Sequence, residues 1–106
     1  MRPWHRLKRW LSIRKLRSVI NCYVRRWSDY GNLLFAVAAY LKKRPEWSRY
    51  YDDSALWVMA KMEVEAAIER VASDGLLSRE AHRRAMREIK IATKRRGYND
   101  NVTKNL

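Results

Sequence analysis

Residues that interrupt helices are scarce in this chain, which holds only three Gly and two Pro among its 106 residues. Strand signals are missing as well, because no run of alternating apolar and polar residues is bounded by turn residues. Most of the chain is built instead from Ala, Leu, Met, Glu, Lys and Arg, which favour helix. Since the length suits one domain, we expect a single all-α domain, a small helical bundle.

Cysteine and long apolar runs are equally scarce. Cys22 is the only cysteine, which excludes an internal disulfide and fits a reducing compartment. Because its sequence neighbours are apolar, we expect it to be buried. The longest apolar run, residues 33–41, has about half the length that a bilayer requires, and no apolar signal segment follows the first charges. The sequence therefore predicts a cytoplasmic protein without a transmembrane segment.

Residues that carry out catalysis are few. The chain has two histidines, His5 and His82, and no cluster of His, Cys, Asp and Glu with the spacing of metal ligands. Its glycines stand far apart, at 31, 75 and 97, so no phosphate-cradling loop is formed. We expect neither an enzyme nor a bound metal or cofactor.

Positive charge is what the chain has in excess, with a net charge of +13. Residues 1–28 hold nine Lys or Arg and no acid, and residues 79–96 hold eight bases against two acids. Residues 29–75 hold six bases against eight acids. A surplus gathered into two segments is typical of a surface that binds a polyanion, most often nucleic acid.

Apolar periodicity predicts about four helices, over residues 4–27, 32–43, 53–72 and 79–96. Acids and Ser at 52–54 and Ser78 are expected N-caps, while Pro45 and Gly97 end the helices before them. The helix at 32–43 is apolar nearly all round and belongs at the centre, against the apolar side of 53–72. Residues 1–97 then form one domain, and residues 98–106 a flexible tail.

The first predicted helix carries two apolar stripes on nearly opposite sides. Heptad spacing joins Ile13, Leu16, Ile20, Tyr23 and Trp27, which suit the core, whereas Trp4, Leu7 and Leu11 face the other way. We therefore expect either a bend near Ser12 or a separate basic arm, residues 1–11. The arm's candidate phosphate contacts are Arg2, Arg6, Lys8 and Arg9, and its candidate stacking residues are Trp4 and Trp10. Alternatively, both Trp side chains cover a corner of the core.

One face of the last predicted helix carries only positively charged residues. Helical spacing places Arg79, Arg83, Arg87, Lys90 and Lys94 within an arc of roughly 80°, and Arg84 adds to the same candidate set. The row is about 22 Å long at about 1.5 Å per residue, which suits a helix laid in or across a major groove. Alternatively, the acids Glu65 and Glu69 of the preceding helix neutralise it.

Residues 75–89, GLLSREAHRRAMREI, resemble the recognition segment of helix-turn-helix DNA-binding domains. The matching positions are Gly75, Leu77, Ser78, Arg79, Arg83, Arg84, Ala85 and Ile89. The resemblance implies that Ser78, Arg79, His82 and Arg83 lie near DNA, while Met86 and Ile89 face the body. Two features depart from the pattern, an extra residue between Gly75 and Ser78 and a histidine at position 82, where an apolar residue is usual.

An aromatic cluster at residues 44–57 offers a further candidate, Trp47, for stacking on bases. Alternatively, its aromatic side chains clamp the connection between helices onto the core. We expect a small DNA-binding protein, with DNA favoured over RNA, and a regulatory role such as control of transcription. One alternative is a protein-interaction module or inhibitor, of the kind that mobile elements encode, that docks its basic face on an acidic protein. Another is a peripheral membrane protein that uses residues 1–27. Exposed Trp and the Ala-rich face also suit a homodimer.

Overall fold

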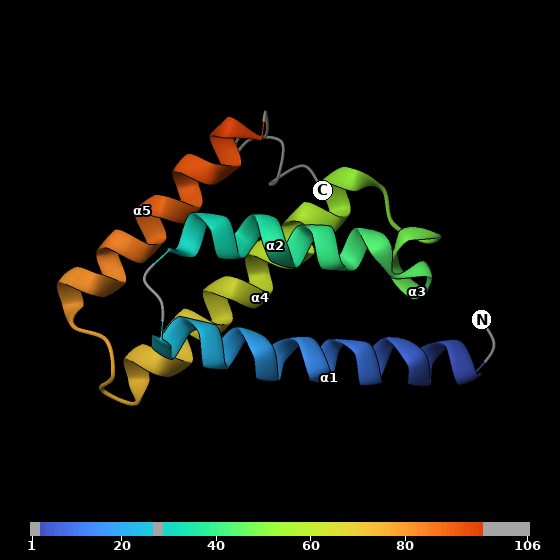
Figure 1. Cartoon of the computed structure of the whole chain (residues 1–106), viewed down its shortest axis with the longest axis horizontal. Helices are drawn as coiled ribbons and strands as arrows, with labels where there is room; N and C mark the ends of the chain where they lie inside the picture. The colour runs from blue at the N-terminus through green and yellow to red at the C-terminus, as the bar shows by residue number, and fades with distance from the viewer. Residues whose placement is uncertain (1–2, 27–28, 97–106) are drawn as a thin grey trace.

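Five helices make up the regular structure of the computed structural model, which describes residues 3–26 and 29–96 and the side chains from residue 7 onward. They are α1 (Pro3–Arg26), α2 (Tyr30–Lys43), α3 (Pro45–Ser48), α4 (Asp53–Ser73) and α5 (Arg79–Arg95). The described ranges contain no strand, so the predicted all-α bundle is confirmed (Figure 1).

The helix starts follow from capping chemistry. Asp29, Asp52 and Ser78 accept hydrogen bonds from the backbone N–H groups of Asn32, Ala55 and Ala81, at 3.2, 2.8 and 3.1 Å. Each cap satisfies a donor that the first helical turn leaves unpaired. Two of these caps were predicted. The third starts α2 two residues earlier than expected.

Pro45 separates α2 from a short helix that the sequence did not reveal. Arg44 adopts an extended conformation with φ −94° and ψ 117°, as the steric demand of the following proline requires. Pro45 then occupies the first position of α3, where its missing N–H is harmless. The result is a sharp turn that brings Trp47 back onto the bundle.

The core lies where α2 and α4 cross, with α1 packed on one side and α5 on the other (Figure 1). The predicted apolar side of α4 is confirmed, because its apolar residues are buried: Leu56, Trp57, Ala60, Val64, Ala67, Ile68 and Val71. Gly31 faces α5 where α2 crosses it, and a Cβ added here would lie 3.8 Å from the Cβ of Ala92. This is ordinary van der Waals contact, so the two helices cross at a distance that would also accommodate an alanine.

Two tryptophan indoles form hydrogen bonds with Ser12 and Thr93, the two polar residues that are buried within the described ranges. Trp47 donates from Nε1 to the Ser12 hydroxyl at 3.3 Å. Trp57 donates to the Thr93 hydroxyl at 3.4 Å, and this hydroxyl donates to the Ile89 carbonyl at 2.9 Å. A buried indole N–H needs an acceptor, and these hydroxyls provide it.

Helix α1 runs without interruption from Pro3 to Arg26, so residues 3–11 are the first half of this helix. Arg9 ties this half to the α3–α4 connection, because its guanidinium lies 3.3 Å from the Tyr51 hydroxyl and 5.6 Å from the Tyr50 ring.

The conflict between the two stripes of α1 is resolved by burying only one of them. Leu16 and Ile20 are in the core, whereas Leu7 and Leu11 remain half exposed on the opposite side. The expected burial of Cys22 is wrong: its side chain is exposed, because it lies on the side of α1 away from Ile20. Trp27, Gly97 and the predicted tail 98–106 lie outside the described residues.

Phe35 is only partly buried and packs against the core, with its ring centroid 5.1 Å from that of Trp57. The centre of α2 is therefore better represented by Leu34, which is fully buried. Within the described ranges, no helix combines the length and the apolar character needed to cross a bilayer.

Candidate nucleic-acid interface

The exposed face of α5 carries the predicted row of cations, which we call the basic ridge: Arg79, Arg83, Arg87, Lys90 and Lys94. All five side chains are exposed, as are their neighbours Arg84 and Arg95. The opposite face of α5 holds Ala85, Ile89, Ala92 and Thr93, which are buried against α2 and α4. The small Ala residues let α5 lie close to the body, so that the longer cations project outward.

No member of the basic ridge forms an ion pair within the part of the chain that the structure describes. The cations elsewhere are often paired, as Arg17 is with Glu63 at 2.9 Å, Lys42 with Asp53 at 3.5 Å and Arg25 with Asp74 at 4.0 Å. Arg96, the last base of the segment, reaches Asp53 at 3.0 Å and also stacks on Trp57. The ridge is therefore a row of five exposed cations on one helix face without an ion pair among the described residues.

The acids of α4 do not neutralise the ridge. Glu65 lies 3.9 Å from Lys61 on its own helix, and Glu69 lies 2.6 Å from Nε2 of His82. Glu63 is engaged with Arg17 through two hydrogen bonds of 2.9 Å, which raise the pKa of Arg17. The alternative in which Glu65 and Glu69 neutralise the basic face of α5 thus does not hold for the described residues.

The two acids of α5 itself have separate positions. Glu80 is exposed in the first turn, where a negative charge favours the helix dipole. Glu88 turns toward α2 and accepts the backbone N–H of Tyr30 at 3.3 Å. Burial raises the pKa of the Tyr30 phenol, opposed by Arg84 and reinforced by Glu88. The charge of Arg84 therefore lies close enough to Tyr30, at the α2–α5 contact, to lower the pKa of its phenol.

The segment that resembles a helix-turn-helix recognition region has part of the implied arrangement. A turn at 74–78 joins α4 to α5, and Gly75 adopts a φ of 75°, which suits glycine. Ser78, Arg79 and Arg83 are exposed and Ile89 is buried. His82 departs from the implied role, because it turns toward α4 and contacts Glu69.

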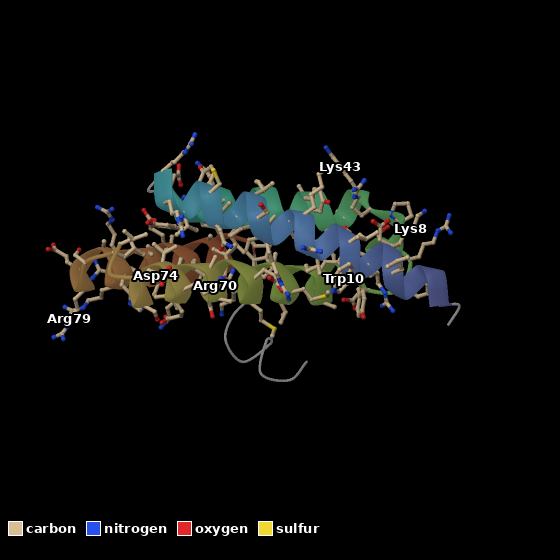
Figure 2. The ribbon with its side chains drawn as sticks, turned by 90° about the horizontal axis from the view of Figure 1, so that it is seen from below. Lys8, Trp10, Lys43, Arg70, Asp74 and Arg79 are labelled. Atoms are coloured by element: carbon tan, nitrogen blue, oxygen red, sulfur yellow. The ribbon has the colours of Figure 1, made fainter. Side chains whose placement is uncertain are left out.

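The candidate residues of the N-terminal segment lie far from the ridge. Figure 2 shows Lys8 and Arg79 at opposite ends of the molecule. The longest extent of the molecule is 44 Å. The basic residues at the start of α1 therefore do not form one continuous surface with the ridge. Arg2 lies outside the described residues, and Trp4 and Arg6 lie outside the described side chains.

The two described stacking candidates have different surroundings. Trp47 is 8% exposed, and its indole bonds Ser12 in the core, so its ring face is not accessible to a base. This residue clamps α3 onto the bundle, as the alternative interpretation held. Trp10 is 52% exposed and lies under the Arg14 guanidinium at 5.3 Å, at a distance from the ridge.

Arg25 and Arg26 are basic residues near α5 that sequence reasoning did not select. Both are exposed at the C-terminal end of α1, and Arg25 approaches Asp74, in the turn that leads into α5. They lie at the same end of the molecule as Arg79. Their separation from α5 in the sequence, by about fifty positions, hid this placement.

Metal chemistry finds no support in the described parts of the chain, where no three His, Cys, Asp or Glu side chains come close enough to hold an ion. Cations and a few hydroxyls are the polar groups that the site offers, and these bind anions. Comparisons of the chain with protein families, curated proteins and solved structures give no match.

Proposed function

We propose that this chain is a small nucleic-acid-binding protein that contacts phosphates through the basic ridge of α5. The observation that carries the proposal is that no ridge residue has an ion pair among the residues that the structure describes. Like charges spaced at (i, i+4) repel each other by a few tenths of a kcal/mol per pair, and phosphates relieve this repulsion. Binding releases the counterions that surround the nucleic acid.

Duplex DNA is the favoured partner over RNA. A single helix about 10–12 Å in diameter, held to the body by one face, fits the major groove of B-DNA, which is about 12 Å wide. The major groove of an RNA duplex is too deep and narrow for this. The described part of α5 also lacks aromatic side chains, which single-strand binders use for stacking.

Phosphate contacts position a protein without reading sequence. We therefore expect modest sequence preference from the ridge. Any base recognition would come from Ser78, Arg79 and Arg83 at the start of α5. This binding mode suits a regulatory protein that acts on DNA, for example in the control of transcription. Its expected location is the cytoplasm.

The direct test replaces Arg83 and Arg87 together by Gln and measures affinity for a duplex by fluorescence anisotropy. We expect a loss of roughly tenfold or more that is similar for unrelated sequences. The matched control is Lys43→Gln with Arg49→Gln, which removes the same charge from exposed positions outside α5 and should have a much smaller effect.

Equal losses in the two variants would show that net charge alone attracts the nucleic acid. If the unchanged chain does not bind nucleic acid even at low salt, the proposal fails. The surviving function would then be docking on an acidic protein, which the same unpaired ridge also fits. A pull-down from nuclease-treated lysate identifies such a partner.

A further inference from the structure

Three large apolar side chains in the first half of α1 face away from the bundle. Leu7, Trp10 and Leu11 are 54%, 52% and 50% exposed. Their spacing of three and four residues places them on one side of the helix, and we call them the outer apolar face. The core-facing side of α1 is nearly opposite, so this face has no partner among the described residues that would bury it.

Positive charge borders the outer apolar face. Arg14 and Lys15 lie one turn beyond Leu11, on either side of it, and residues 1–28 contain no acid. Between α1 and the start of α3, Lys8 and Lys15 line a depression beside Leu11. Arg44 and Glu46 also line it and pair with each other at 3.6 Å, so Lys8 and Lys15 supply its net positive charge. Lys8 and Lys15 flank one side of the apolar strip, and Arg14 continues it one turn beyond Leu11. Such an arrangement complements a surface that is apolar inside and anionic outside.

We propose that the outer apolar face binds the surface of an anionic phospholipid bilayer. The two leucines would enter the boundary between headgroups and acyl chains, as the apolar face of an interfacial helix does. Trp10 would sit at headgroup level, where Trp is enriched. Lys8, Arg14 and Lys15 would approach the negative headgroup charges, which attract basic residues near the surface.

The shape of the molecule allows this orientation. Helix α1 has 24 residues, and its first half forms an outer edge of the bundle (Figure 1). A planar surface could therefore approach this edge of the bundle, where Leu7 and Leu11 are exposed. Because Lys8 and Arg79 are at opposite ends of the molecule (Figure 2), a bilayer on α1 leaves the basic ridge open to DNA.

Other occupants of this face fit less well. A second copy of the chain would set the cations beside Leu11 against the same cations, which repel. Phosphates of a nucleic acid would match Arg14 and Lys15 but leave the two leucines without apolar contact. A convex helix is also a poor counterpart for a flat acidic protein surface, because little of its apolar strip would be buried.

The test is co-sedimentation of the full chain with vesicles made of equal parts phosphatidylserine and phosphatidylcholine. Leu7→Gln with Leu11→Gln should weaken binding by about tenfold, since these side chains supply the apolar contact. The matched control is Val19→Gln, which changes an apolar residue of α1 that is 59% exposed and lies off the face. Its binding should equal that of the unchanged chain.

A second variant checks the charges, and two assays separate the functions. Arg14→Gln with Lys15→Gln keeps the leucines and should reduce binding to phosphatidylserine vesicles several-fold. The leucine variant should keep its DNA affinity and melting temperature, whereas Arg83→Gln with Arg87→Gln should keep its vesicle binding. This inference does not depend on the nucleic-acid proposal, because different variants report on each.

Four results would overturn the inference. They are no binding to the phosphatidylserine vesicles at low salt, equal binding to vesicles of phosphatidylcholine alone, equal loss in the Val19 control, and vesicle binding that is lost only when the ridge is changed. The last result would mean that α5 attracts any polyanion, lipid included, without help from α1.

Discussion

Repulsion between neighbouring cations is the cost of the basic ridge at the scale of single residues. Arg83 lies four positions from Arg79 and from Arg87, so it takes part in two repulsive pairs. No acid of α4 relieves it, since Glu63 and Glu69 are engaged with Arg17 and His82. Such unrelieved charge is common at binding sites, where stability and function compete.

Arg83→Glu should therefore stabilise the fold and weaken DNA binding. The substitution turns both repulsive pairs into attractive ones, which we expect to raise the free energy of unfolding by about 0.5–1 kcal/mol. Urea denaturation measures this change, and anisotropy with duplex DNA measures the loss of affinity. Lower stability in this variant would mean that Arg83 makes a stabilising contact within the chain.

Ion pairs between helix ends act at the scale of elements. Asp53, at the start of α4, faces Lys42 at the end of α2 and Arg96 just after α5, at 3.5 and 3.0 Å. Burial alone would raise the pKa of Asp53, but Arg96 and Lys42 outweigh it and leave this pKa below its usual value. One carboxylate thus helps to hold three helices together.

Asp53→Asn should lower the stability by less than about 1 kcal/mol at neutral pH, because the pair is solvent-exposed. A depressed pKa means that the unfolded chain takes up the proton first, so the contribution of Asp53 is complete above about pH 4 and is lost as the pH falls further. Thermal melting at several pH values should show the two chains converging in acid. A difference that persists at the lowest pH would contradict this account.

The control for this experiment is Glu80→Gln. It also removes an acid from the first turn of a helix, but Glu80 has no ion pair with any residue that the structure describes. Its effect reports the helix dipole, typically about 0.3–1 kcal/mol, together with local attraction to Arg83 and Arg84 in the same helix. The excess loss in Asp53→Asn is then the contribution of Lys42 and Arg96.

The elements themselves were predictable where local chemistry decides them. Capping residues and apolar periodicity located α4 and α5 to within about two residues, because both signals act within one turn of helix. Helix α3 was missed because four residues carry no periodicity. Cys22 was placed wrongly because its sequence neighbours Ile20 and Val24 point to the core, whereas residues two positions apart on a helix face different directions.

At the scale of the whole molecule, the packing of the helices determines which charged and apolar side chains stay exposed, and the sequence alone does not predict this. Helical spacing alone predicted the row of cations on α5, but whether an acid neutralises them depends on how α4 is rotated against α5. The same applies to α1, where two apolar stripes were visible and only packing shows that Leu7 and Leu11 stay outside. It also applies to Arg25, which tertiary structure brings toward the turn before α5.

The central claim is that the basic ridge binds the phosphates of DNA. The salt dependence of the DNA affinity tests this claim most directly. With five contacts, a plot of log affinity against log salt should fall with a slope near −4 to −5, because each neutralised phosphate contributes about −0.9. Replacing Arg83 and Arg87 by Gln should flatten this slope by about 2. A slope that both chains share, or one near zero, would contradict the account.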